Sequence, residues 1–139
     1  MTLPCALRFT ILFAVLALAG CGPGGPSLIS VEGKITADNN PLPQGSLAFH
    51  PDAAKGNTSK KTAAAEIKDG SYKVFTDGRP GAPAGWYKVT VVSAGEPDNT
   101  KPEAPVKSLV APRYADPKLT DQLIEVKAGG SYDLKVSSK

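Results

Sequence analysis

The sequence has few of the residue types on which most enzyme chemistry depends. Its 139 residues include a single histidine and two cysteines, too few for a His/Cys metal cluster, for a nucleophile with its base, or for a disulfide framework. An excess of charge is also missing, because 16 basic residues face 13 acidic ones and both are scattered along the chain. Proteins that bind nucleic acids neutralise several phosphates with grouped basic residues, so we expect no nucleic-acid partner.

Glycine and proline are plentiful by contrast. The chain has 14 glycines and 13 prolines, above the average usage of roughly 12% for the two together. Both residues interrupt helices and favour turns, and a length of 139 residues suits one small domain. The composition therefore predicts a single turn-rich domain.

The N-terminus has the layout of a signal peptide. Arg8 supplies a positive charge, and residues 9–20 form an apolar run of 12 residues without a charge. This run is shorter than the roughly 17–25 residues that a helix needs to cross a bilayer, and glycines and prolines follow it at residues 22–26. A buried core helix is the alternative, but this layout favours a processed segment. We expect residues 1–20 to be removed.

Four residues at the end of this run resemble a lipobox, the recognition site of bacterial lipoprotein signal peptidase. They are Leu18, Ala19, Gly20 and Cys21. The resemblance implies cleavage between Gly20 and Cys21, a diacylglyceryl group on the Cys21 thiol, and an acyl chain such as palmitate on the new amine. Because each buried methylene contributes about 0.8 kcal/mol, two or three acyl chains hold a protein firmly on a membrane. We therefore expect a membrane-anchored lipoprotein.

This processing would remove both free thiols and determine where the mature chain is sorted. Cys5 leaves with the signal peptide and Cys21 is consumed by lipid, so no thiol remains for a disulfide or a zinc site. By the sorting rule of such lipoproteins, an Asp directly after the lipidated cysteine favours retention at the inner membrane, whereas this chain has Gly22. We expect the protein in the cell envelope, anchored to an outer membrane on its periplasmic or surface face.

Beyond a short linker at residues 21–27, alternation of apolar and polar residues predicts strands throughout a domain at residues 28–139. The segment 62–67 contains three alanines that suit a helix equally well, and its alternation favours a strand. Residues 95–112 hold four prolines and little alternation, which predicts a long loop. We expect seven strands, at residues 29–36, 45–50, 62–67, 71–75, 86–92, 123–127 and 131–136.

The pairing and burial of these strands can also be predicted. Asp69 and Gly70 are a tight-turn signal that predicts a hairpin, and we expect the last two strands to form another. The inward set is rich in the branched and aromatic residues that pack well on a pleated surface. It comprises Ile29, Val31, Ile35, Leu47, Phe49, Tyr72, Val74, Tyr87, Val89, Val91, Ile124, Val126, Tyr132, Leu134 and Val136. The predicted fold class is all-β, a seven-stranded antiparallel sandwich of two sheets.

Three groups of residues resemble the carboxypeptidase-regulatory-like or transthyretin-like domains. The first group is Val31, Gly33, Ile35, Thr36, Asn40, Pro41, Leu42, Gly45, Leu47 and Phe49. The second is Pro83, Ala84, Gly85, Tyr87, Val89 and Val91, and the third is Pro112, Arg113 and Tyr114. The resemblance implies a prealbumin-like, or Ig-like, seven-stranded sandwich that serves as an accessory or binding module on secreted and surface proteins. A fold carries no activity with it.

The enzymes of this family have functional residues or domains that the chain lacks. Transthyretin-like hydrolases that act on hydroxyisourate gather several His and Arg in a cleft and end in Tyr-Arg-Gly-Ser, whereas this chain has one His and ends in Val136, Ser137, Ser138 and Lys139. Metallocarboxypeptidases carry their zinc ligands in a separate catalytic domain, for which the chain has no room. We therefore expect no enzymatic activity, no cofactor and no metal.

Two exposed positions are candidates for function. His50 faces outward by alternation and precedes Pro51, so we interpret it as a surface histidine at a strand end rather than a general base, which would need an orienting carboxylate and a nucleophile. Trp86 also faces outward and could stack on a sugar or a partner protein. The simpler interpretation is that it covers a sheet face or lies under the loop 95–112.

The remaining candidates are polar residues of the loops. Arg113 and Tyr114 either close the long loop against the sandwich, which we favour, or contact a ligand or partner. Lys60 and Lys61 fit a solvated turn.

Two functional hypotheses remain from the sequence. The first is a non-enzymatic envelope lipoprotein whose sandwich binds or scaffolds an envelope protein or glycan through edge strands or the long loop. The second is a carbohydrate-binding or hydrolase-accessory protein with an unrecognised site, which a cleft with several acidic groups or a histidine would support.

Overall fold

The computed structural model describes residues 25–139, which fold as an all-β structure with two short 3-10 helices, η1 (Ala53–Lys55) and η2 (Pro112–Ala115). The expected signal peptide, the lipobox with Cys21, and the first residues of the linker lie outside the described residues. Within residues 25–139, no helix is long and apolar enough to cross a membrane.

All seven expected strands are present. They are β2 (Glu32–Ala37), β4 (Gln44–Pro51), β5 (Ala63–Lys68), β6 (Ser71–Thr76), β9 (Gly85–Val92), β10 (Leu123–Val126) and β11 (Leu134–Val136). Four strands of two residues each accompany them: β1 (Leu28–Ile29), β3 (Asn40–Pro41), β7 (Arg79–Pro80) and β8 (Ala82–Pro83). The alanine-rich segment is a strand, with Ala63, Ala65 and Ile67 buried and the residues between them exposed.

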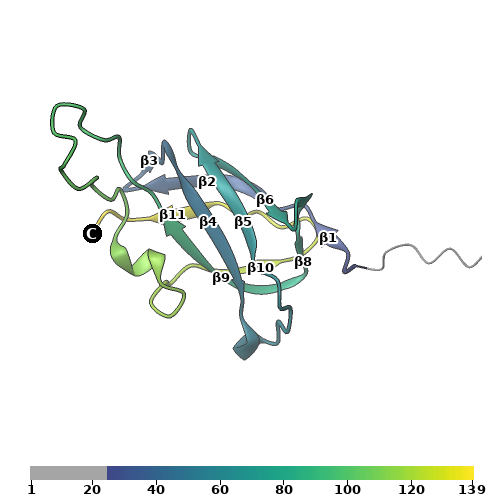
Figure 1. Ribbon diagram of the computed structural model, residues 1–139. Helices are drawn as coiled ribbons and strands as arrows, with labels where there is room; N and C mark the ends of the chain where they lie inside the picture. The colour runs from purple at the N-terminus through teal and green to yellow at the C-terminus, as the bar shows by residue number, and fades with distance from the viewer. Residues whose placement is uncertain (1–24) are drawn as a thin grey trace, which may run out of the picture.

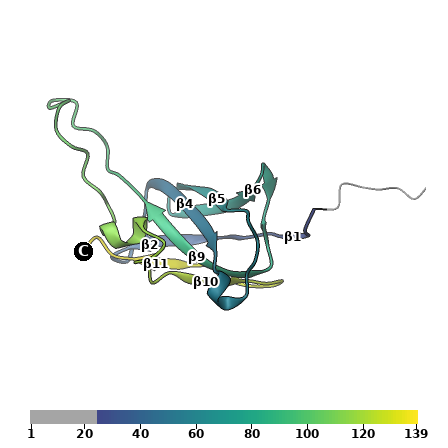
Figure 2. The same cartoon turned by 60° about the horizontal axis from the view of Figure 1, so that its bottom comes forward.

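The long strands form one curled sheet in the order β10-β9-β4-β5-β6-β2-β11, while β1 and β8 form a small second sheet. All neighbours pair antiparallel except β2 and β11, which are parallel. Figure 2 shows how the sheet folds over, so that β4, β5 and β6 form a layer above β2, β10 and β11. The prediction of an all-β sandwich is confirmed, with a curled sheet supplying both layers.

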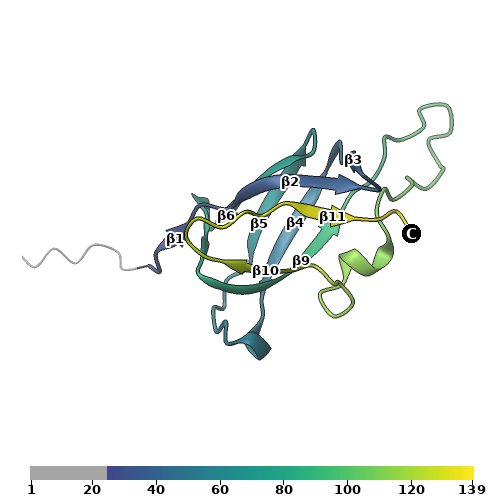
Figure 3. The same ribbon diagram turned by 180° about the vertical axis from the view of Figure 1, so that it is seen from behind.

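The expected hairpin of the last two strands does not form. β10 pairs with β9, and β11 pairs with β2, so the two strands are opposite edges of the sheet. Their connection, residues 127–133, crosses from one edge to the other (Figure 3). The Tyr132 hydroxyl turns back and donates to the Lys127 carbonyl at 2.6 Å. Alternation revealed the strands but not their partners, because it reports which face is buried rather than which edge is paired.

The interior of the curled sheet is the core. The inward set expected from alternation is buried, except Ile29 and Ile124, which pack half-buried at its margin. Phe49 lies at the centre, with ring centroids 6.3 Å from Tyr72 and 6.1 Å from Tyr87. The two tyrosine hydroxyls donate to backbone carbonyls, Tyr72 to Tyr132 and Tyr87 to Pro83. In the described part of the chain no buried side-chain polar atom lacks a partner, so the core is fully satisfied.

The long loop is present and projects from the body of the sandwich (Figure 1). Its base is closed by the Ala94–Ser108 bridge and by hydrogen bonds of 2.9 Å from the Gly95 amide to the Lys107 carbonyl and from the Leu109 amide to the Ser93 carbonyl. Beyond this base, residues 96–107 are all exposed. Residues 96–107 therefore add surface, whereas Val110 and Ala111 at the end of the loop are buried in the core.

The strands define two ends of the sandwich. The tether end carries the entry of the chain and the connections 25–31, 52–62, 77–84 and 127–133. The loop end carries the connections 38–43, 69–70 and 93–122 and the C-terminal residues 137–139. Figures 1 and 3 show the entry of the chain and the long loop at opposite ends. The start of the described chain is therefore remote from the long loop.

Candidate functional site

The outer face of β4, β5 and β6 carries an open hollow of about 660 Å³, which we call the outer-face hollow. Its volume is in the range of small-molecule and side-chain binding pockets. The residues around it come from three adjacent strands: Ser46, Leu47, Ala64, Ala65, Glu66, Lys68, Ser71, Tyr72, Lys73 and Phe75. No candidate from the sequence analysis lies in it.

The hollow results from small side chains beside large ones. Ala64 of β5 pairs with Phe75 of β6, and Ser46 of β4 pairs with Val92 of β9. Phe75 is 44% exposed and lines the hollow beside the small Ala64, whereas Val92, 53% exposed, pairs with Ser46 outside the lining. Alternation predicts the outward direction of these residues, and the low volume of Ser46 and Ala64 is the signal that could have pointed to a hollow there.

The charges around the hollow alternate in sign. Glu66 forms an ion pair of 3.5 Å with Lys68, and both side chains are about four-fifths exposed. Across the strands, Glu66 pairs in register with Lys73, which pairs in turn with Glu32. Exposed pairs of this kind contribute little to stability, but they leave the hollow without a strong net charge. The hollow therefore suits an apolar group with a polar surround better than a highly charged ligand.

A second hollow, of about 200 Å³, lies beside β3 at the loop end. Leu42 forms its base, and Leu109 reaches it from the end of the long loop. Its one acidic residue is Asp38, whose pKa is lowered because Ser138 hydrogen-bonds to its carboxylate, the backbone amide at 3.2 Å. This arrangement fixes the C-terminus against the β2–β3 turn and offers no group with the raised pKa of a general acid.

His50 lies on the outer face, one residue before the end of β4, as expected. Its Nε2 is 3.0 Å from the Thr90 hydroxyl on the neighbouring strand. Within residues 25–139, no group of three or more His, Cys, Asp or Glu side chains could hold a metal ion.

Trp86 is half-buried on the outer face, near the tether end of β9. Lys55 of η1 places its ammonium 4.7 Å from the centre of the indole ring. The Trp86 carbonyl accepts hydrogen bonds of 2.9 Å from the Asp52 amide and the Asn57 side chain. Besides Glu125 of β10, with which Trp86 pairs in register, these contacts come from the β4–β5 connection, whereas the long loop leaves β9 at its other end.

Arg113 and Tyr114 lie in η2 and connect the long loop to the core. Tyr114 is 3% exposed. The Arg113 guanidinium stacks 4.8 Å from the Tyr114 ring centre and donates hydrogen bonds of 3.0 Å to the Tyr114 and Ser137 hydroxyls. The hydrogen bond to Tyr114 raises the pKa of Arg113. The structure therefore separates this pair, at the loop end, from Trp86.

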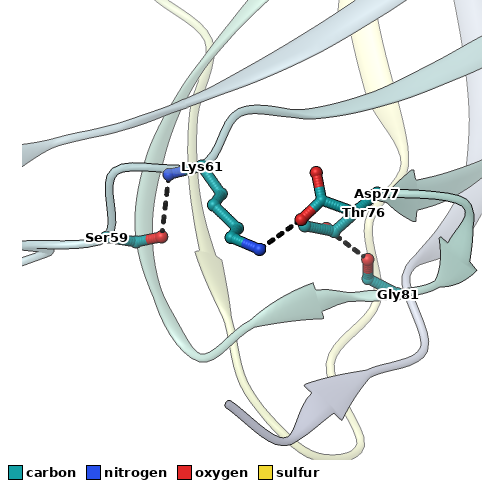
Figure 4. Close-up of polar contacts among 5 residues, drawn as sticks. All are labelled: Ser59, Lys61, Thr76, Asp77 and Gly81. Atoms are coloured by element: carbon teal, nitrogen blue, oxygen red, sulfur yellow. Dashed lines mark hydrogen bonds and ion pairs between the residues drawn. The ribbon is translucent and has the colours of Figure 1, made fainter. Parts of the chain in front are cut away.

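Lys60 and Lys61 are exposed on the β4–β5 connection, as a solvated turn requires. Lys61 forms an ion pair with Asp77 in the β6–β7 turn (Figure 4). In the same view, the Lys61 amide donates to the Ser59 hydroxyl at 3.3 Å, and the Thr76 hydroxyl donates to the Gly81 carbonyl at 2.7 Å. These contacts join two connections of the tether end.

Comparison with protein-family models, with curated proteins and with solved structures finds no match. The resemblance to transthyretin-like domains thus depends on the residues quoted above, and function has to be argued from the chain itself.

Proposed function

We propose that the protein is a membrane-anchored lipoprotein of the cell envelope whose β-sandwich acts as a binding or scaffolding module without enzymatic activity. The observation that carries this proposal is the tetrad Leu18, Ala19, Gly20 and Cys21 after a short apolar run. Cys21 lies seven positions before Leu28, the first residue of β1. Lipid attached at Cys21 would therefore connect almost directly to a folded domain.

The geometry of the domain supports a binding role. Its core is closed and its buried polar groups are paired, while the outer-face hollow and the exposed loop provide surface for contact. The apolar border and balanced charges of the hollow suit an apolar side chain, so we expect the partner to be another envelope protein. The carbohydrate-binding or hydrolase-accessory alternative requires a cleft with several acidic groups or a histidine, whereas the outer-face hollow has one carboxylate, paired with Lys68.

The lipid anchor is tested by Cys21→Ser in the full-length chain. We expect this variant to remain an uncleaved precursor or to become soluble, because no thiol is available at the cleavage site. Mass spectrometry of the N-terminal peptide and membrane fractionation measure the two effects. Cys5→Ser is the matched control, since it removes the other thiol of the chain and should leave processing normal. Normal processing and membrane attachment of Cys21→Ser would overturn the proposal.

The sorting expectation is tested by Gly22→Asp. If the sorting rule for such lipoproteins applies, this variant should keep its lipid and move to the inner membrane, while the wild-type chain fractionates with the outer membrane. Gly22→Ser is the control, because it changes the side chain without adding charge. An unchanged distribution of Gly22→Asp would contradict the expected sorting.

The hollow is tested by Ala64→Arg, which places a long charged side chain in it. We expect covalent crosslinking to envelope proteins to fall while the melting temperature stays close to that of the wild type, because Ala64 is exposed. Thr62→Arg is the control, since Thr62 is exposed just before β5 and does not line the hollow. Equal crosslinking by the two variants would show that the hollow is not the contact surface.

A further inference from the structure

The two ends of the sandwich carry opposite net charge. The connections of the tether end hold three acidic side chains and five basic ones, Lys55, Lys60, Lys61, Arg79 and Lys127. The connections and C-terminal residues of the loop end hold seven acidic side chains and five basic ones. Counted over these connections, the side-chain charge is +2 at the tether end, where Lys127 is also paired with Glu125 of β10, and −2 at the loop end. The connections at the two ends therefore differ in the sign of their net charge.

The chain enters the domain at the basic end. The seven residues that lead from Cys21 to Leu28 span at most about 25 Å when fully extended. A strand of eight residues such as β9 is itself about 26 Å long. A lipid on Cys21 would therefore hold the tether end close to a bilayer, whereas the loop end lies at least one strand length further along the domain.

Arg79 lies beside this entry point. A Cβ atom added to Gly25 would be 3.1 Å from an Arg79 guanidinium nitrogen, so the guanidinium lies against the chain four residues after Cys21. Arg79 and Lys60 are both exposed. Their charges are therefore placed where a surface next to the anchor would meet them first.

We propose that the tether end is a docking surface for the headgroups of anionic phospholipids, an inference that rests on the proposed lipid attachment at Cys21. Basic side chains are attracted to an anionic bilayer within a Debye length, about 8 Å at physiological ionic strength. A tether of at most about 25 Å lets the tether end approach the bilayer to within this range, where its basic side chains are attracted, whereas the loop end would be repelled by the same surface charge if it approached. The domain therefore stands with its long loop directed away from the membrane.

The experiment measures the orientation of the lipidated, full-length mature protein in vesicles. Lipidation leaves no free thiol in the mature chain, so a fluorophore can be placed on a single new cysteine. Ser131→Cys reports the tether end and Asn99→Cys the loop end, and both positions are exposed. Energy transfer to an acceptor dye in the lipid headgroups is compared in vesicles of phosphatidylcholine alone and of phosphatidylcholine mixed with phosphatidylglycerol.

We expect stronger transfer from the Ser131→Cys label than from the Asn99→Cys label in mixed vesicles, and a smaller difference in added salt or in phosphatidylcholine alone. Lys60→Glu with Arg79→Glu should remove the dependence on phosphatidylglycerol. The matched pair Lys107→Glu with Lys118→Glu, two exposed residues of the loop end, should preserve it. The proposed docking surface would be overturned by equal energy transfer from the two labels. It would also be overturned by a difference in transfer that does not depend on lipid charge or on the tether-end substitutions. A chain without attached lipid in the mass spectrum would instead overturn the proposed function.

Discussion

Two connections at opposite ends of the sandwich are held in different ways. The β10–β11 connection at the tether end is bound at both sides by tyrosine hydroxyls, because Tyr132 bonds to the Lys127 backbone and Tyr72 donates to the Tyr132 carbonyl. The long loop at the loop end is closed at its base by backbone hydrogen bonds and exposes every residue from 96 to 107. The first connection is therefore held against the core by two buried tyrosines, whereas residues 96–107 of the second lie outside the core.

This difference matches the proposed roles of the two ends. A surface that docks on a bilayer benefits from rigid connections, because their charges keep fixed positions relative to the tether. A loop that extends from the opposite end is free to contact other molecules. The following predictions test whether stability is concentrated in the buried tyrosines and close-packed turns, and whether the long loop lacks it.

The largest effect is expected where the loop end meets the core, at Tyr114. Tyr114→Ala should lower the free energy of unfolding by about 3–5 kcal/mol, because it empties the space of a buried aromatic ring. Tyr114→Phe keeps the ring and removes the hydrogen bond from Arg113, so it should cost about 1 kcal/mol. Urea denaturation measures the free energy of unfolding of both variants. A loss below 1 kcal/mol for Tyr114→Ala would mean that η2 does not close the core.

The next effect is expected at the tether end, where Gly81 lies against β1. Gly81 has a φ of +105°, and a Cβ there would collide with the Ile29 carbonyl, so Gly81→Ala should cost about 2–3 kcal/mol. Gly78 has a φ of +76° but nothing within 4 Å of an added Cβ. Gly78→Ala should therefore cost only about 1 kcal/mol. Equal losses of unfolding free energy would show that the approach of β1 to β8 is not tight.

A third effect appears at alkaline pH and concerns the core tyrosines. Burial raises the pKa of Tyr72 and the pKa of Tyr87 in the folded protein, whereas a tyrosine in an unfolded chain ionises near 10. Above pH 10 the unfolded state therefore binds fewer protons than the folded state, and stability falls as pH rises. Each such tyrosine lowers the free energy of unfolding by up to about 1.4 kcal/mol for each pH unit above 10.

Tyr72→Phe should reduce this alkaline slope, because it removes one of the two groups. The measurement is the free energy of unfolding in urea at a series of pH values above 10, and Tyr87→Phe is the matched variant. The slope, and not the absolute stability, is compared, since both substitutions also remove a hydrogen bond to a backbone carbonyl. An unchanged slope in both variants would contradict the assignment of alkaline unfolding to the buried tyrosines.

Much of the fold could be predicted from local patterns. Alternation located all seven long strands, and the Asp69–Gly70 turn joins β5 to β6 as expected. The partner of β11 could not be predicted, because a short strand that is buried on one face fits either edge of a sheet equally well. The position of Trp86 relative to Lys55 was missed for a similar reason, since their contact crosses a connection whose path is set by the Asp52 and Asn57 hydrogen bonds.

The candidate sites also differ in whether the sequence alone can reveal them. The tetrad at Cys21 is a motif in consecutive residues, so it can be recognised from the sequence alone. The outer-face hollow and the opposite charges of the two ends depend on which strands are neighbours and at which end each connection lies. Residues that are scattered in the sequence carry no such signal until the topology is known.

The smallest effect is expected in the long loop itself. Replacing residues 96–106 by Asn-Gly would join Gly95 to Lys107 in a tight hairpin, across the hydrogen bond that already links them. A shorter loop costs less closure entropy, by roughly 1.5 kcal/mol for this change, while the stricter turn geometry offsets part of the gain. We therefore expect the free energy of unfolding to change by less than about 1 kcal/mol.

Lipid attachment and the energy transfer from the Ser131→Cys label should be unchanged in this loop variant, because both depend on the tether end. A loss of stability as large as that of Tyr114→Ala would show that the loop packs on the sandwich, and the contrast between the two connections would then be wrong.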